Sequence, residues 1–270
     1  MRSPLLLLAL FALGLATAPA SALELTNPRN TYGELGGTRP EAALLPGDVL
    51  FVGFDIEGIS INAEGNVVYT MGMELQDKAG KSIFKQEPVQ KSDFVPLGGN
   101  KLPARAYITV GLDQLPGEYV LKVTVTDVAT KTAKTLDRKF TVAPKDFGIV
   151  AVYTSVDERG QIPSPTTGVV GQSVFVQFGI VGFARDATKK QPIVLIEMQP
   201  LDDAGKPTVS KPSVFNLDAG VDEKDPGFSV RFLLPLTRAG KFTIRLKATD
   251  KVANKTYTFD VPLAVVPSAN

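Results

Sequence analysis

The sequence predicts an all-β protein made of two tandem β-sandwich domains that follow a signal peptide. Three observations predict this fold class. Short segments in both halves of the chain alternate between apolar and polar residues, the second half repeats the first at an offset of 124 positions, and residues 5–15 are the one segment that looks helical. That helical segment belongs to the signal peptide, which leaves strands for the rest.

Alternation with period two is typical of a strand that covers a hydrophobic core with one face. Residues 119–126 show it most clearly, and residues 242–249 repeat it. Further strands are expected at 50–56, 69–75 and 106–112 and at their counterparts 174–180, 193–198 and 230–236. Turns with glycine at 77–81 and 202–206 fit between strands. About seven short strands per copy predict a sandwich rather than a closed barrel.

The repeat divides the chain into two domains of similar length. Residues that match at the offset of 124 include Gly47, Phe51, Phe54 and Gly58, paired with Gly171, Phe175, Phe178 and Gly182. One position of slippage aligns residues 79–81 with 204–206. Because the matches keep their order along most of the chain, we expect a duplicated unit. The predicted domains are residues 23–145 and 146–270, joined near Pro144.

Residues 1–22 have the pattern of a secretory signal peptide. Arg2 precedes the apolar residues 5–15, and Ala20-Ser21-Ala22 fits the small-residue cleavage rule. The alternative is an uncleaved anchor, for which the apolar stretch is short. The predicted location is therefore extracytoplasmic, either periplasm or cell surface. No later segment is long enough to span a bilayer, so no transmembrane segment is expected after signal cleavage.

Charge and composition exclude several classes of function. Without Arg2 the chain carries 28 basic and 28 acidic side chains, which argues against nucleic acid as a partner. The chain has no Cys, no His and no Trp. A Ser-His-Asp triad, a thiolate nucleophile and Cys- or His-based metal centres are therefore excluded. We expect no cofactor and no enzymatic activity.

Residues 115–127, Leu-Pro-Gly-Glu-Tyr-Val-Leu-Lys-Val-Thr-Val-Thr-Asp, resemble the sixth strand of immunoglobulin-like and fibronectin-III-like domains of secreted bacterial proteins. In such domains a Gly-x-Tyr opens the strand and an Asp closes it. The resemblance places Tyr119 at the tyrosine corner, whose hydroxyl bonds to upstream backbone. Phe242 takes this place in the second copy, so that bond is not expected there. The resemblance implies two immunoglobulin-like domains and specifies no function.

A cluster of carboxylates is the candidate metal site. Asp222, Glu223 and Asp225 follow closely after Asp218, and oxygen ligands suit Ca²⁺. The alternative is a solvated acidic loop between strands, which Lys224 in the middle of the cluster favours.

Two other pairs of residues are candidates for catalysis. Asp55 and Glu57 share one face of a strand and could form a glycosidase pair, although two side chains on the wet face of a strand explain them better. Ser82 and Lys85 match an S-x-x-K motif but fall on a predicted strand, where they point to opposite faces. Asp127 and Asp250 each end a strand and are interpreted as turn residues.

These observations predict a non-catalytic module of the cell envelope that interacts with an envelope protein or glycan. Binding is expected at long loops, at residues 59–65, 86–101, 184–191 and 216–226, or at an uncovered sheet edge. A glycan face would use exposed tyrosines, of which the candidates are Tyr32, Tyr107, Tyr153 and Tyr257. The alternatives are a carboxylate-dependent hydrolase of envelope glycans and a calcium-stabilised adhesive module.

Overall fold

The computed structural model describes residues 22–268, and every regular element in this range is a β-strand. The predicted all-β fold class is therefore confirmed. The predicted signal peptide, residues 1–22, lies outside the described residues except for Ala22. Among residues 22–268 there is no helix long and apolar enough to cross a membrane.

The N-terminal half, residues 23–142, is a sandwich of two antiparallel sheets. One sheet has the order β1-β2-β5 and the other the order β4-β3-β6-β7. The strands are β1 (Glu24–Thr31), β2 (Val49–Glu57), β3 (Asn66–Asp77), β4 (Ser82–Phe94), β5 (Lys101–Thr109), β6 (Gly117–Asp127) and β7 (Ala133–Val142). Both sheets contribute to one hydrophobic cluster, which includes Phe54 of β2 and Leu121 of β6.

The C-terminal half, residues 147–266, repeats this arrangement with two short additional strands. Its sheets have the orders β14-β11-β8-β9 and β10-β16-β15-β12-β13. The strands are β8 (Gly148–Ser155), β9 (Pro163–Ser164), β10 (Thr167–Val169), β11 (Ser173–Val181), β12 (Val194–Asp202), β13 (Ser213–Leu217), β14 (Gly227–Pro235), β15 (Gly240–Asp250) and β16 (Lys255–Val266). A second cluster, with Phe178 and Leu246, fills the space between these sheets.

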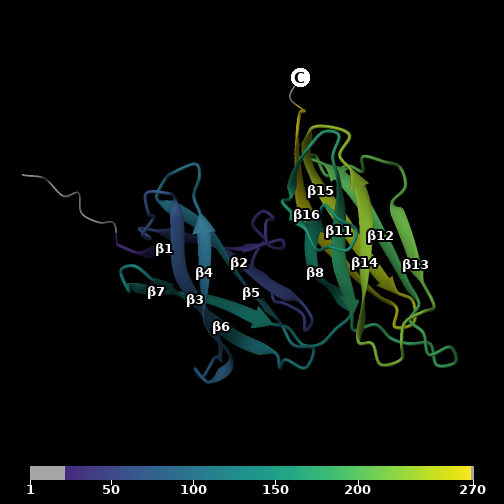
Figure 1. Ribbon diagram of the computed structural model, residues 1–270. Helices are drawn as coiled ribbons and strands as arrows, with labels where there is room; N and C mark the ends of the chain where they lie inside the picture. Colours follow the sequence, from purple (N-terminus) through teal and green to yellow (C-terminus); the bar gives the residue numbers. More distant parts are fainter. Residues whose placement is uncertain (1–21, 269–270) are drawn as a thin grey trace, which may run out of the picture.

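The two halves lie side by side, and residues 143–147 connect them (Figure 1). The predicted boundary after residue 145 lies in this connection. That each half is a domain in its own right stays a prediction.

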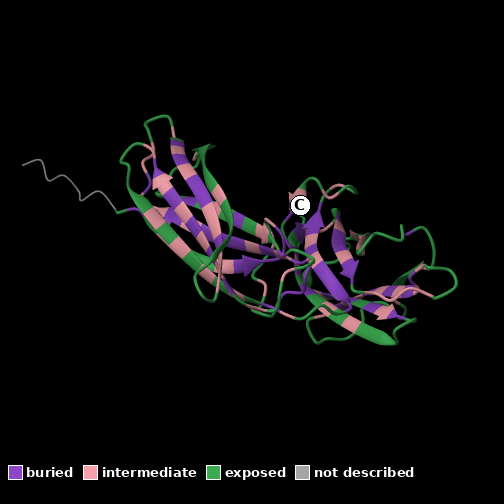
Figure 2. Ribbon diagram, turned by 90° about the horizontal axis from the view of Figure 1, so that it is seen from below, coloured by how far each residue is buried: buried purple, intermediate pink, exposed green. Residues whose placement is uncertain are grey.

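Alternation along each strand sets which face is buried. In β6, Leu121, Val123 and Val125 are fully buried while the intervening residues are partly exposed. Figure 2 shows the same banding of buried and exposed residues on many strands. Where one face of a strand meets the core and the other meets solvent, as in β6, the pattern in the sequence is sufficient to orient the strand.

The predicted tyrosine corner is present. Tyr119 donates a hydrogen bond from its hydroxyl to the carbonyl oxygen of Leu115 over 2.6 Å, and its ring stacks on Phe140. The position equivalent to Tyr119 in the C-terminal half is occupied by Phe242, which has no hydroxyl to donate.

Unusual backbone conformations recur at matching positions of the two halves. Asn27 and Ala151, 124 positions apart, both have φ of 51° and both lie where a bulge interrupts pairing with the neighbouring strand. Gly58 and Gly182 have φ of 68° and 67°. A left-handed residue is costly unless it is glycine, so the same local geometry at equivalent positions reflects the same chain path.

One predicted loop is a strand. Residues 86–101 were expected to connect strands, but β4 runs through Ser82–Phe94 and pairs with β3. Every residue of β4 except Gln86 is exposed, so its sequence lacks the apolar face that marks other strands. The other long loops, at 59–65 and 184–191, lack named strands. Of residues 216–226, the first two end β13 and the others lack a named strand.

Tyr32 of the N-terminal half is part of the hydrophobic cluster of the C-terminal half. It is 4% exposed, its ring packs edge-on against Phe259 at 6.1 Å, and its hydroxyl donates to the carbonyl oxygen of Asp260. Burial raises the pKa of this hydroxyl. The expectation that Tyr32 is exposed is therefore wrong, because the connection between β1 and β2 folds against the other half.

A buried ion pair lies beside Tyr32. Arg39 contacts the carboxylate of Asp48 at 2.6 Å, and the Asp48 side chain is 2% exposed. The other carboxylate oxygen accepts hydrogen bonds from the backbone N–H groups of Val49 and Ala151, both at 2.8 Å. Because Ala151 sits at the bulge of β8, its left-handed conformation directs an N–H across the junction between the halves.

Candidate interaction surface

The outer face of the three-stranded sheet in the N-terminal half carries an exposed aromatic pair. Phe51 of β2 lies opposite Tyr107 of β5, with their ring centroids 5.7 Å apart. Tyr107 is 54% exposed and is the most exposed large aromatic side chain of this sheet. Arg105, two residues earlier on β5, forms an ion pair with Glu34 at 3.0 Å. We call Glu34, Phe51, Arg105 and Tyr107 the aromatic face.

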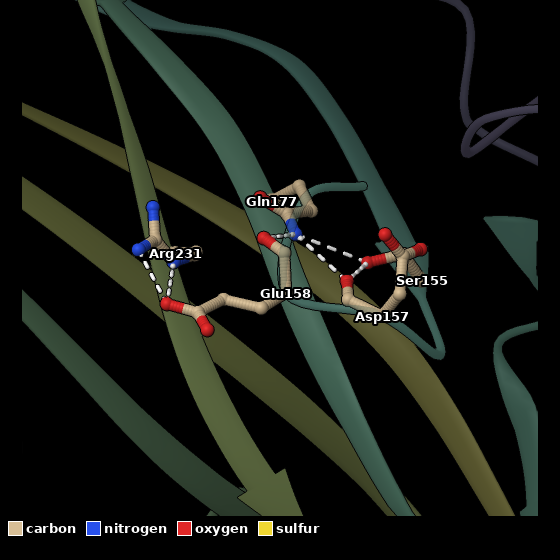
Figure 3. Close-up of polar contacts among 5 residues, drawn as sticks. All are labelled: Ser155, Asp157, Glu158, Gln177 and Arg231. Carbon is tan, nitrogen blue, oxygen red and sulfur yellow. Dashed lines mark hydrogen bonds and ion pairs between the residues drawn. The ribbon is translucent and has the colours of Figure 1, made fainter. Parts of the chain in front are cut away.

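The C-terminal half has the same constellation without the tyrosine. Phe175 of β11 lies opposite Leu233 of β14, and Arg231 forms two hydrogen bonds to Glu158 at 2.5 and 3.0 Å (Figure 3). Leu233 is 53% exposed and takes the place of Tyr107. The strand register, the ion pair and the apolar pair are therefore repeated on both sandwiches.

A polar network supports the second constellation. The side-chain amide of Gln177 is 3.0 Å from the hydroxyl of Ser155 and 3.4 and 3.1 Å from the carbonyl oxygens of Asp157 and Glu158 (Figure 3). The Ser155 hydroxyl itself donates to the Asp157 carbonyl at 2.8 Å. These bonds fold the turn after β8 over the sheet and hold Glu158 near Arg231.

The equivalent position to Gln177 in the N-terminal half is Gly53, and this difference shapes the aromatic face. Thr31 keeps the hydroxyl-to-carbonyl bond, donating to Gly33 at 2.7 Å, but no side chain rises from Gly53. The guanidinium of Arg29 lies over that site, about 3.5 Å from where a Cβ would be. In the N-terminal half, the Arg29 guanidinium therefore takes the place beside Tyr107 that the Gln177 side chain fills in the C-terminal half.

The predicted calcium ligands do not converge. Asp222 accepts the backbone N–H of Lys224 with its side chain, and the backbone carbonyls of Asp222 and Asp225 accept hydrogen bonds from the Arg185 guanidinium at 2.7 and 2.8 Å. Asp218 and Glu223 lie in the same exposed loop. Within residues 22–268 no group of three or more Asp or Glu side chains is placed to hold a metal ion. Hydrogen bonds from the Arg185 guanidinium to the backbone, and not a metal ion bound by carboxylates, hold this loop in the structure.

Asp55 and Glu57 lie on the outer face of β2, as expected, and each has nearby partners. Asp55 accepts a hydrogen bond from Asn27 at 2.8 Å, and Glu57 accepts one from Thr26 and pairs with Lys101 at 2.7 Å. The hydrogen bond from Lys101 has the largest effect on the pKa of Glu57, followed by that from Thr26, and both lower it. A glycosidase acid needs a raised pKa, so this environment opposes that role.

Ser82 and Lys85 fall on β4, where the sequence placed a strand. Lys85 pairs with Glu87 at 2.8 Å on the surface. The strand geometry keeps the Ser82 and Lys85 side chains from acting as a nucleophile and its base.

Asp127 and Asp250 form turns, as predicted, and also have a role that local sequence did not reveal. Asp127 accepts N–H groups from Ala129 and Thr130 in its own turn, and its second oxygen accepts the N–H of Ser60 in a distant loop at 2.9 Å. Asp250 accepts the N–H of Ala184 in the same way at 2.7 Å. Burial alone would raise the pKa of Asp127, but the hydrogen bonds outweigh it and hold the pKa below its usual value.

Comparison with known proteins gives no assignment of function. No protein-family model matches the chain, and no curated protein sequence matches it. Solved structures with some similarity include the C-terminal domain of the Streptococcus pyogenes antigen I/II-family protein AspA, with 10% identity, a TM-score of 0.30, and coverage of 90% of this chain and 100% of that chain. The C-terminal domain of the Streptococcus agalactiae AgI/II polypeptide BspA is similar with 10% identity and a TM-score of 0.31. The match covers 89% of this chain and 100% of that chain.

Red sea bream transglutaminase is similar over 92% of this chain, with 10% identity and a TM-score of 0.30. The chain spans 32% of the length of that enzyme. Similarity at this level carries no information on activity, substrate or partner.

Proposed function

We propose that this protein is a non-catalytic, extracytoplasmic module of the cell envelope that binds an envelope protein or glycan through the aromatic face. The observation that supports the proposal is the exposure of Tyr107 beside Phe51, with the Arg105–Glu34 pair within the same surface. Tyrosine and arginine are among the residue types that dominate binding energy at protein interfaces, and an exposed ring next to charged hydrogen-bonding groups also suits a sugar.

The rigid junction supports a binding role. Because Tyr32 and the Arg39–Asp48 pair join the two halves through buried contacts, the aromatic face is held at a fixed orientation to the C-terminal half. A preorganised surface loses less entropy on binding than a mobile loop does.

The test measures binding of the immobilised full chain to two fractions, solubilised envelope proteins and purified envelope glycans. We expect binding to one fraction, weakened roughly tenfold by Tyr107→Ala and by Arg105→Ala. Leu97→Ala, at a 99% exposed leucine in a distant loop, is the matched control and should bind as the wild type does. Lack of binding to both fractions, or equal binding by Tyr107→Ala, contradicts the proposal.

The hydrolase alternative has a separate readout. Conversion of the glycan fraction to smaller products by the wild type, abolished by Asp55→Asn or Glu57→Gln, would replace the binding proposal with a catalytic one.

A further inference from the structure

Strands β5 and β14 are equivalent edge strands, and each pairs with its neighbour over nine residues without a bulge. At their ends, Val110 exchanges backbone hydrogen bonds with Gly47 and Asp48, and Leu236 does so with Gly171 and Gln172. Bonded positions alternate along an antiparallel strand. Even-numbered residues of both strands therefore bond to the sheet, and the N–H and C=O groups of odd-numbered residues point to the free edge.

The two edges carry proline at different odd-numbered positions. β5 has Pro103 opposite Asp55, and β14 has Ser229 opposite Gly179, which are equivalent places in the register. Proline has no N–H and its ring blocks an incoming strand, a common protection of sheet edges. β14 has no proline before its last residue, Pro235. Its N–H groups at Ser229, Arg231 and Leu233 are therefore free to pair with another strand.

The long edge strand β4 is protected in other ways. It contains Pro88 at a bulge, a second register shift near its start, and Lys85 and Lys91. Bulges, proline and lysine all discourage edge-to-edge pairing. β13 is only five residues long.

The edge strand β7 is also long and regularly paired, but it carries Lys134, Arg138 and Lys139, and the N–H of Leu44 already bonds to the carbonyl of Thr141 near its end. Of the edges β4, β5, β7, β13 and β14, β14 is thus the one that combines length, regular pairing and an open row of donors.

The side chains of β14 suit an identical strand. Its inward row consists of the apolar residues Phe228, Val230, Phe232 and Leu234, and its outward row contains one charge, Arg231, already neutralised by Glu158. Two copies of β14 can pair antiparallel about a twofold axis, which is the symmetry of most dimers. Registers that place Arg231 opposite Ser229 or opposite Leu233 avoid like charges face to face. The second register sets Ser229 opposite Pro235 at the end of the ladder, where the Pro235 carbonyl accepts the Ser229 N–H and proline has no N–H to donate in return.

We propose that a second copy of this chain pairs with β14, so that two β14-β11-β8-β9 sheets join into one continuous sheet. Pairing satisfies the free backbone groups of both edges and brings two apolar inward rows together. The dimer would carry two aromatic faces, one on each N-terminal half. Gly227, Phe228 and Ser229 line a cleft of about 490 Å³ together with Val110 and Leu112 of the N-terminal half, so the ladder ends at Ser229 and is centred toward the other end of β14.

The test is sedimentation of the full chain over a wide range of concentration. We expect a reversible monomer–dimer equilibrium in the wild type. Ser229→Pro should weaken dimerisation by roughly tenfold or more, since each copy loses a free N–H and gains a blocking ring. Because β5 accepts proline at the equivalent position, the thermal midpoint of this variant should stay close to the wild type.

A second variant guards against a folding defect in the first. Leu233→Lys changes an exposed side chain and places a cation near Arg231 of the partner copy, so the dimer should weaken at low salt and recover partly at high salt. Leu97→Lys is the matched control and should dimerise normally. Tyr107→Ala should also dimerise normally, which separates this inference from the proposed function.

A wild-type chain that stays monomeric up to millimolar concentration overturns the proposal, as does dimerisation of Ser229→Pro and Leu233→Lys with wild-type affinity. A monomer that instead binds an extended segment of another protein at β14 also overturns it.

Discussion

The Tyr32 hydroxyl donates a hydrogen bond to the backbone carbonyl of Asp260, 228 positions later in the chain, at 3.1 Å. Tyr32 follows β1 of the N-terminal half directly, yet its ring lies in the core of the C-terminal half. The two halves therefore share a hydrophobic core contact at their junction, and their stabilities should be coupled.

Replacement of Tyr32 tests this coupling. Tyr32→Ala should lower the free energy of unfolding by about 3–5 kcal/mol, because it empties a buried aromatic site. Tyr32→Phe, which removes only the hydroxyl, should cost about 1 kcal/mol. Urea denaturation measures both, and hydrogen exchange should rise in β16, next to Phe259. Leu97→Ala, at a leucine that is 99% exposed, is the control and should change stability by less than about 0.5 kcal/mol.

The Arg39–Asp48 pair should be costly to break from one side. Asp48→Ala leaves a buried guanidinium and the Ala151 N–H without their acceptor, so we expect a loss of about 3–5 kcal/mol in the free energy of unfolding. The double variant Arg39→Leu/Asp48→Leu should recover part of this loss, because no buried charge remains. Equal stability of Asp48→Ala and the wild type in urea would show that the pair does not hold the junction.

The tyrosine corner can be tested by removing the hydroxyl at Tyr119 and by adding one at the equivalent Phe242. Tyr119→Phe should cost about 1 kcal/mol, since the carbonyl of Leu115 loses its hydroxyl donor. Phe242→Tyr introduces a hydroxyl at the equivalent position and should leave stability unchanged or raise it slightly. Thermal and chemical denaturation of both variants check this, and a large loss in Phe242→Tyr would show that the two corners differ in shape.

Asp127 should contribute a stability that depends on pH. Its pKa is lowered in the folded protein, so its contribution is fully present above the unfolded pKa, about 3.9, and is lost as pH falls through the folded value. Asp127→Asn should cost about 1–3 kcal/mol at neutral pH, since its amide has one acceptor oxygen and cannot accept both the N–H groups of its own turn and the Ser60 N–H. The difference between wild type and variant should shrink below about pH 4. A difference that stays constant down to pH 2 would contradict this assignment.

Removal of Ca²⁺ with EDTA tests whether the candidate site at Asp218, Asp222, Glu223 and Asp225 binds calcium. Because Arg185 binds the backbone of the 222–225 turn, we expect the melting temperature to be the same with EDTA and with excess Ca²⁺. Arg185→Ala should instead increase proteolysis or hydrogen exchange in residues 218–226. A rise in melting temperature on adding Ca²⁺ would restore the calcium-stabilised alternative.

Local patterns in the sequence were sufficient for several turns and for the eight strands β2, β3, β5, β6, β11, β12, β14 and β15. The side chain of Asp77 accepts the N–H groups of Ala79 and Lys81, and Asp202 does the same for Ala204 and Lys206. These contacts span four positions or fewer, so residue types and spacing predict them. The alternation in β6 and β15 is equally local, because the pleat of a strand fixes which side chains share a face.

The missed features depend on contacts between distant segments. β4 has no apolar period, and it is a strand because β3 supplies its hydrogen-bond partners. Asp127 and Asp250 were recognised as turn residues, but their bonds to Ser60 and Ala184 cross between loops. The acidic run at 222–225 suggested a metal because the sequence could not show that Arg185 lies against it.

The sequence by itself determined the all-β class and the face that each alternating strand buries, because these follow from period-two patterning and short-range turn geometry. Only the tertiary structure decided that Tyr32 is buried and Tyr107 exposed, although both are tyrosines in the same half. Whether an aromatic side chain packs or faces solvent depends on what the fold brings opposite it. For Tyr32 that is the core of the C-terminal half, whereas Tyr107 lies on the outer face of an edge strand.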